Sequence, residues 1–185
     1  AWGVTDPASL AFLDPPPQPA VAEARALLTS LGGLDADGRI TEEGKRLRAL
    51  PLTPRLGRMV VDAAARGEGR LAADLALLVS ERGLGGEDVH LGHRLDRFRS
   101  DRSRRAEDAR RMAAGWLREV TSAPDIGSGP ERAGAVLALA FPDRIARARG
   151  KDGDFVLANG RGGSVDPASP LARETFLAVA EIGGV

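Results

Sequence analysis

The stretch from Leu31 to Pro54, LGGLDADGRITEEGKRLRALPLTP, constrains the fold more than any other part of the chain. It opens on a glycine pair that ends a preceding helix, and its DADG segment predicts a tight turn with glycine at the position that needs a positive φ. Thr41 is placed to cap the next helix, and the two acids after it suit the positive end of that helix. Pro51 then stops the helix. Helix, hairpin and helix in this order predict a winged-helix unit, although another small α/β fold-back fits the same pattern.

After Pro54 the apolar residues recur at helical spacing in five successive stretches, separated by short glycine- or proline-containing connections. We therefore expect a helical bundle over residues 54–141. The residues expected to face its core are Leu56, Met59, Val60, Ala63, Ala64, Leu71, Leu75, Leu78, Val79, Leu91, Leu95, Phe98, Ala109, Met112, Ala113, Trp116, Leu117, Val120, Ala133, Val136, Leu137 and Ala140.

The apolar spacing changes after Phe141-Pro142. Residues 144–149, 155–158 and 175–182 predict three strands, and residues 159–170 predict a loop between the last two. Three strands are too few to close a barrel. Residues 142–185 are therefore expected to form a partial β segment, after a winged helix over 1–53 and a helical bundle over 54–141.

Charge and composition exclude several classes of function. The 26 basic and 26 acidic residues cancel, and the absence of cysteine excludes disulfides and thiolate chemistry. No apolar run approaches the roughly 20 residues of a membrane span, and no signal peptide is visible, so we expect no membrane partner. The chain begins without methionine, which favours an excised fragment or a processed start.

The sequence offers no catalytic site. A GxxxxGK[ST] phosphate loop is absent. The GRGGS segment at 160–164 fits a small anion nest, but a β-turn fits it better because no helix follows to supply aligned donors. His90 and His93 supply too few ligands for a zinc site, so solvated surface histidines are the simpler interpretation. We expect no metal and no catalytic residue in this chain.

An arginine-rich segment is the remaining chemical signal. Residues 94–118 hold nine arginines and four acids, whereas residues 1–43 hold two bases and seven acids. Arg104, Arg111 and Arg118 are seven residues apart, and Arg97 extends this series if the helix is continuous. Guanidinium groups on one flank suit phosphates and stacked bases, while pairing with Asp96, Asp101, Glu107 and Asp108 on a solvated face is the alternative. The candidate nucleic-acid-binding residues are Arg97, Arg104, Arg105, Arg111 and Arg118. Phe98 and Trp116 are better explained as core residues than as stacking platforms.

The opening stretch, continued to Ala64, resembles the helicase-associated region that follows the two motor domains of DEAH/RHA-type helicases. The matching positions are Leu31, Gly32, Leu34, Asp35, Gly38, Thr41, Gly44, Leu50, Pro51, Leu52, Pro54, Arg55, Leu56 and Met59, with FLDPPP at 12–17 as the lead-in. Residues 137–150, 155–162 and 176–182 are similar to the bacterial HrpB branch. The resemblance is weak over 84–130, where the arginines lie.

The resemblance implies a mainly α fold: a degenerate winged helix, a ratchet-like helical bundle and a small partial β, OB-like segment. It also implies an accessory module that guides nucleic acid for an ATP-dependent helicase in the bacterial cytoplasm, with single-stranded RNA as the expected nucleic acid. ATP and Mg are expected in motor domains of the same protein, which also serve as its partners, and not in this chain. The acidic wing residues Asp35 and Asp37 argue against a wing that grips phosphates.

Two other functions fit parts of the sequence. The first is a free-standing winged-helix DNA-binding regulator with a helical dimerisation domain. Residues 41–50 offer Lys45, Arg46 and Arg48 for such a role, but no amide side chain to read base edges. The second is a scaffold that binds other proteins through its helices.

Overall fold

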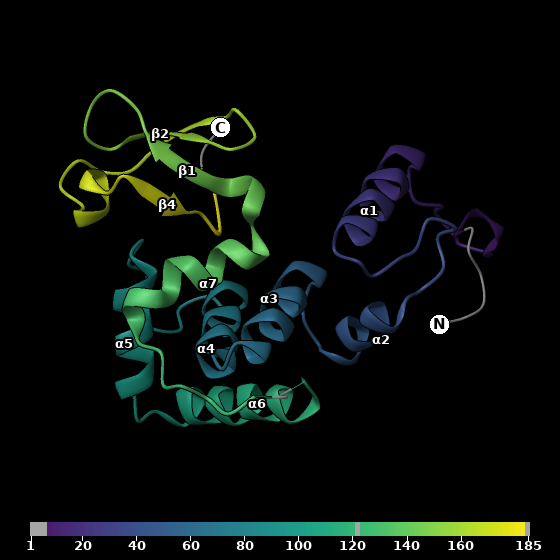
Figure 1. Cartoon of the computed structure of the whole chain (residues 1–185), viewed down its shortest axis with the longest axis horizontal. Helices are drawn as coiled ribbons and strands as arrows, with labels where there is room; N and C mark the ends of the chain where they lie inside the picture. The colour runs from purple at the N-terminus through teal and green to yellow at the C-terminus, as the bar shows by residue number, and fades with distance from the viewer. Residues whose placement is uncertain (1–6, 121–122, 184–185) are drawn as a thin grey trace. The chain divides into compact units, whose positions relative to one another are not determined.

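The computed structural model describes residues 7–120 and 123–183 and divides into two compact units, 1–57 and 58–185 (Figure 1). The turn-rich lead-in expected before the first helix is described only from Pro7, where a short 3-10 helix, η1 (Pro7–Ser9), begins. The first residues of that lead-in and residues 121–122 lie outside the described part. The predicted division into three domains, 1–53, 54–141 and 142–185, stays a prediction.

The first unit contains the helix–hairpin–helix predicted from the sequence. It consists of α1 (Gln18–Ser30), a short wing and α2 (Glu42–Ala49), and the chain then enters α3 (Pro54–Ala65). The hydroxyl of Thr41 accepts a hydrogen bond from the Gly44 N–H at 2.9 Å, which confirms the predicted cap. The wing has one antiparallel bridge, between Leu34 and Ile40. Such a wing is shorter than a full hairpin, so the winged helix is degenerate, as expected.

The turn of the wing uses its acids for its own backbone. Gly38 has a φ of 75°, which is the left-handed conformation predicted for it. The Asp35 carboxylate accepts hydrogen bonds from the N–H groups of Asp37 and Arg39 at 3.0 and 2.8 Å. This arrangement is an Asx turn. Asp35 therefore stabilises the turn.

A close backbone approach holds α2 against the end of α1. A Cβ atom at Gly44 would collide with the Gly33 carbonyl oxygen, so only glycine fits there. The buried apolar residues Leu47 and Leu50 follow on α2 and at its C-cap. By contrast, α1 has no buried residue.

The second unit begins with a helical bundle around α4 (Gly69–Ser80). Its other helices are α3, α5 (Leu91–Ser100), α6 (Arg104–Val120) and α7 (Ala133–Ala140), and the short 3-10 helix η2 (Pro130–Arg132) precedes α7. In Figure 1 α4 lies among α5, α6 and α7, and it contacts all three. Every α4 residue from Gly69 to Leu78 except the half-buried Arg70 is buried, because a helix apolar on all sides occupies a core.

The described strands form an antiparallel sheet in the order β3-β2-β1-β4. The strands are β1 (Ile145–Ala148), β2 (Asp154–Leu157), β3 (Gly162–Ser164) and β4 (Phe176–Ala178). Two more 3-10 helices, η3 (Pro142–Arg144) and η4 (Pro170–Arg173), precede β1 and β4. Ala146, Phe155 and Leu157 form the core of the sheet, packed by Val165, Leu177 and Val179. Among the described residues, no helix is both long and apolar enough to cross a membrane.

The prediction of three strands was wrong in two respects. The segment 159–170, predicted as a loop, contains β3, which pairs with β2 through Asp154 and Ser164 and two further pairs. Its glycines give no alternating pattern, and only backbone hydrogen bonding to β2 reveals it as a strand. The last strand is also shorter than predicted, because only Phe176 to Ala178 pair with β1.

Candidate nucleic-acid interface

One side of α6 packs against α4, and the other side faces solvent. Ala106, Ala109, Ala113 and Trp116 are buried, which gives a stripe at helical spacing against α4. Among the positions on the opposite side are Arg104, Asp108, Arg111, Gly115 and Arg118, spaced by four, three, four and three residues. We call these five residues the outer stripe of α6. Its arginines point away from the core because the small alanines place the other side of the helix against α4.

One apolar residue of α6 that was expected to face the core is exposed instead. Met112 was expected to face the core, but it is 44 % exposed. It lies next to Asp108 and Arg111 on the helix surface, beyond the edge of the narrow alanine stripe. Its position on the helix explains this exposure, because Met112 lies outside the buried stripe that packs against α4.

Asp108 links two arginines of the outer stripe. Its carboxylate lies 3.9 Å from Nε of Arg104, one turn earlier, and forms an ion pair with Arg111 of the following turn. All three side chains are exposed, and that of Arg104 is 94 % exposed. Pairing along the helix, the alternative considered for the arginines, is therefore confirmed for these two residues.

Arg118 is the arginine of the outer stripe to which the described residues offer no such partner. It is exposed, and none of the described residues forms a hydrogen bond or ion pair with its guanidinium group. Its neighbour Gly115 adds no side chain to the surface. The guanidinium of Arg118 is thus available to an external anion.

The other two predicted site residues lie apart from the outer stripe. Arg97 belongs to α5, which ends at Ser100, so the continuous helix that would align it with Arg104 does not exist. It contacts the Asp88 carboxylate at 3.4 Å. Arg105 donates a hydrogen bond to the carbonyl oxygen of Arg82 at 2.7 Å. The structure therefore groups Arg104, Arg111 and Arg118, and places Arg97 and Arg105 on neighbouring surfaces.

Arg94 and Arg110 of the same basic segment bind backbone carbonyl oxygens of the fold. Arg94 donates to the carbonyl oxygens of Leu78 and Leu84 at 2.7 and 3.1 Å. Arg110 donates to the carbonyl oxygens of Phe98 and Asp101 at 2.6 and 2.7 Å, and its Cζ lies 5.5 Å from the Phe98 ring centroid. Phe98 is fully buried, which confirms it as a core residue, and Trp116 is buried as well.

Arg99 binds a buried carboxylate that sequence reasoning missed. Asp74 of α4 is 0 % exposed and accepts hydrogen bonds from Nε of Arg99 at 2.9 Å and Nε of Arg70 at 3.3 Å. The signal was present in the sequence, because Asp74 is a single acid within the apolar run LAADLALLV. A buried acid in such a run needs a basic partner.

A second buried carboxylate fixes the segment before α7. Glu68 is 4 % exposed and binds Nε of Arg132 at 2.8 Å, while the Ser128 hydroxyl donates to it at 3.2 Å. The hydrogen bond from Arg132, followed by that from Ser128, outweighs burial and holds the pKa of Glu68 below its ordinary value. Glu68 thus joins the segment from Ser128 to Arg132 to the residue that precedes α4.

The two histidines serve α5. The side chain of His90 caps the helix by accepting from the His93 N–H, and their rings stack with centroids 4.0 Å apart. His93 contacts Asp88 at 3.1 Å. The hydrogen bond from the His90 N–H is the main cause that lowers the pKa of Asp88. No group of three potential metal ligands occurs within the described residues.

Two of the three exposed basic residues of α2 are paired with acids of the same helix. Lys45 binds Glu42, and Arg46 lies 3.7 Å from Glu43. The hydrogen bond from Lys45 lowers the pKa of Glu42. A helix with two of its three exposed cations already paired has few free cations for a DNA groove.

The glycine-rich segment 160–164 is not a nest at a helix N-terminus. Gly160 has a φ of 83° and ends a turn, after which residues 162–164 form β3. This agrees with the β-turn interpretation at its first residues.

Comparisons with known proteins place these units in a family context. Residues 24–52 match the family model described as the winged-helix part of the helicase associated domain (HA2). The chain is 34 % identical over 178 residues to the ATP-dependent RNA helicase HrpB of Escherichia coli K12, a match that covers 95 % of this chain and 20 % of that protein. It is also 37 % identical over 68 residues to the human probable ATP-dependent RNA helicase DHX35, which covers 36 % of this chain and 10 % of the relative.

The fold of the chain is also similar to that of E. coli HrpB. A crystal structure of the E. coli DExH-box NTPase HrpB superposes with a TM-score of 0.76 at 34 % identity, covering 96 % of this chain and 21 % of that one. A second crystal structure, of the E. coli DEAH/RHA helicase HrpB, gives the same TM-score at 33 % identity. The chain thus spans about one fifth of the length of HrpB.

Proposed function

We propose that this chain, which belongs to the helicase-associated region of the HrpB-type DEAH/RHA helicases, guides single-stranded nucleic acid along the outer stripe of α6. The observation that supports the proposal is the grouping of Arg104, Arg111 and Arg118 on one exposed face of a helix held rigidly against α4. Phosphate neutralisation by such groups gives sequence-tolerant binding.

The geometry suits a moving strand. Residues seven apart on a helix are separated by about 10 Å along its axis, and long arginine side chains can follow phosphates over that span. The outer stripe holds no aromatic residue, so bases would not be held by stacking. A surface of this kind positions a strand without fixing its sequence register.

The energy for movement would come from elsewhere. The 185 residues contain no GxxxxGK[ST] loop, so we assign ATP and Mg to motor domains of the same protein, which are also the proposed partners of this chain. The relatives are named as RNA helicases, which supports RNA as the strand. The bacterial cytoplasm is the proposed location.

The regulator alternative has less support. Its recognition helix would be α2, whose Lys45 and Arg46 are paired with Glu42 and Glu43. In its wing, the Asp35 carboxylate accepts hydrogen bonds from the backbone of the turn. Neither arrangement favours duplex DNA.

A salt titration tests the proposal. The chain is titrated into a fluorescent single-stranded oligouridylate, and anisotropy is read between about 50 and 200 mM salt, a range over which binding to phosphates weakens steeply. We expect weak binding whose logarithm falls linearly with log[salt]. In the triple variant Arg104→Glu, Arg111→Glu, Arg118→Glu, the slope should become shallower by about 0.7 for each phosphate that is no longer neutralised.

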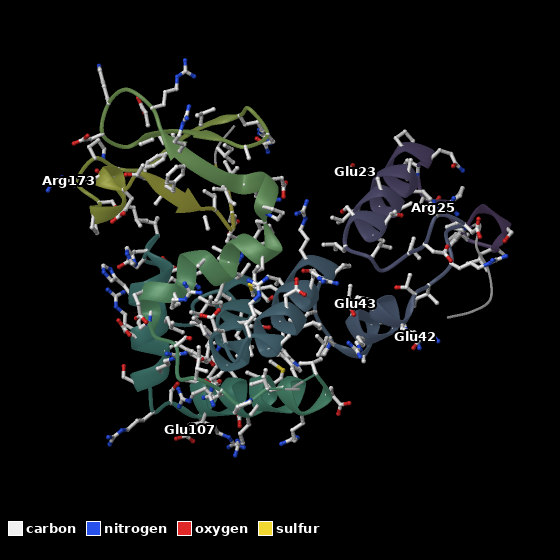
Figure 2. The ribbon with its side chains drawn as sticks, in the orientation of Figure 1. Glu23, Arg25, Glu42, Glu43, Glu107 and Arg173 are labelled. Atoms are coloured by element: carbon white, nitrogen blue, oxygen red, sulfur yellow. The ribbon has the colours of Figure 1, made fainter. Side chains whose placement is uncertain are left out.

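A matched control separates site from net charge. The variant Arg48→Glu, Arg161→Glu, Arg173→Glu makes the same charge change at three exposed arginines outside α6; Arg173 is labelled in Figure 2. Equal losses of affinity in the two triple variants would contradict a site on α6. Tighter, sequence-dependent binding to duplex DNA would favour the regulator instead.

A further inference from the structure

Asp108 stands in the place where the proposed site would hold a phosphate. Its carboxylate lies between Arg104 and Arg111 and contacts both. A carboxylate and a phosphate present the same oxygen acceptors to a guanidinium group. Two of the three arginines in the outer stripe therefore already bind an anion that belongs to the helix itself.

We propose that Asp108 is a built-in competitor for the strand: it occupies Arg104 and Arg111 when no phosphate is present and releases them when one arrives. This inference rests on the proposed function of the outer stripe. It assigns Asp108 as a positioning residue that sets the strength of the grip, and it assigns Arg118 as the arginine that a strand meets without competition.

This exchange lowers the free-energy cost of releasing a phosphate from the arginines. An arginine that loses a phosphate would otherwise return to water unpaired, whereas here the neighbouring carboxylate takes the place of the phosphate. Both ion pairs are exposed, so each is weak enough to be exchanged. A guide surface for a translocating strand needs this property, because each interaction with a phosphate must be broken at every step.

Asp108 differs from the other acids of α6. Glu107 and Glu119 are exposed, yet the described part of the structure gives neither side chain a salt bridge or hydrogen bond. In Figure 2 Glu107 lies at the outer edge of α6, pointing away from α4. Glu107 therefore offers a control for Asp108: the same charge, the same helix and the adjacent position, but no arginine bound.

The test compares Asp108→Asn with Glu107→Gln. Each variant of the chain is titrated into the fluorescent oligouridylate at several salt concentrations, and circular dichroism verifies the helical content. We expect Asp108→Asn to bind roughly three- to tenfold more tightly than wild type, which corresponds to the loss of two exposed ion pairs. Glu107→Gln should bind less than twofold more tightly, since it changes only net charge. The salt dependence of Asp108→Asn should also be steeper, by up to about 0.7 for each additional phosphate that the arginines neutralise.

A double-mutant cycle tests whether Asp108 limits what Arg111 contributes to binding. In wild type, Arg111→Gln should weaken binding less than Arg118→Gln, because Asp108 already occupies Arg111. With Asp108→Asn in the background, the two losses of affinity should become equal. Asp108→Ala serves as a second variant if the asparagine disturbs the helix.

Each outcome decides a question. Equal increases in affinity from Asp108→Asn and Glu107→Gln, or an unchanged order of the two arginine variants, would overturn the role of Asp108 and leave the outer stripe as a site. Absence of binding by wild type and all variants at low salt would instead overturn the proposed function, and this inference with it.

Discussion

Two groups of arginines on α5 and α6 have different surroundings. Arg94, Arg99 and Arg110, which we call the inner arginines, donate to backbone carbonyl oxygens or to the buried carboxylate of Asp74. Arg104, Arg111 and Arg118, the outer arginines, extend from the exposed side of α6. All six lie within one segment of 25 residues that the sequence marks only as basic.

The inner and outer arginines differ in how deeply their partners are buried and in what those partners are. A guanidinium that neutralises a buried acid cannot be removed without leaving a charge in the core, which is costly. An exposed ion pair such as Arg104 with Asp108 adds little to stability, because water and salt screen it. The inner arginines should therefore govern folding and the outer arginines should govern binding. The following predictions test this division, from the largest expected effect to the smallest.

Replacing Arg99 by methionine should have the largest effect. Among the described residues it leaves Asp74 with Arg70 as its only cationic partner, and we expect the free energy of unfolding to fall by about 3 kcal/mol. Urea denaturation followed by circular dichroism measures the change. The double variant Asp74→Leu, Arg99→Met should recover much of the loss. A loss below about 1 kcal/mol would mean that Arg99 behaves like an outer arginine.

Arg110→Met should cost less, about 1 to 3 kcal/mol, because it removes two hydrogen bonds to carbonyl oxygens and the interaction with the Phe98 ring but exposes no buried charge. The same denaturation experiment applies. Arg111→Met, one residue further along α6, is the matched control and should change stability by no more than about 0.5 kcal/mol.

Acid should weaken the buried ion pair between Glu68 and Arg132. The folded-state pKa of Glu68 lies below its ordinary value of 4.5, so its stabilisation is complete above that pH and is lost as the pH falls through the folded pKa. Stability measured between neutral pH and about pH 3 should decline below about 4.5. In Arg132→Gln, which removes the main cause of the lowered pKa, that decline should be smaller. An unchanged decline would assign it to other carboxyl groups.

Arg118→Gln should have the smallest effect on stability, within about 0.5 kcal/mol, because the described residues give its side chain no partner to lose. Its effect should appear instead in the affinity for single-stranded RNA. If the melting temperature fell as far as in Arg99→Met, the division into inner and outer arginines would be wrong.

Much of the fold follows from short-range rules. Thr41 caps α2, Gly38 takes a positive φ and Pro54 begins α3, because caps and breakers act within a few residues. The strand β3 was missed because its three residues pair through the backbone alone. Met112 was misplaced because the buried stripe of α6 is narrower than the apolar pattern of the sequence, and packing in the folded chain sets its width.

The candidate site was less accessible to sequence reasoning. The spacing of Arg104, Arg111 and Arg118 correctly placed them on one face, since helix geometry fixes it. The break between α5 and α6 that separates Arg97 depends on the turn at Asp101, and the partners of Arg94 and Arg99 come from α4 and the turn after it, far away in sequence. Charge alone does not distinguish a cation that binds the core from one that faces solvent.

The most direct test of the account is an NMR titration of the arginine side chains. Nε–H signals are followed while single-stranded RNA is added to the isotopically labelled chain at low salt. We expect the signals of Arg104, Arg111 and Arg118 to shift, and those of Arg94, Arg99 and Arg110 to stay in place. Shifts confined to arginines outside α6, or no shift in the signals of the outer arginines while RNA is bound, would contradict the claim that this face of the helix guides the strand.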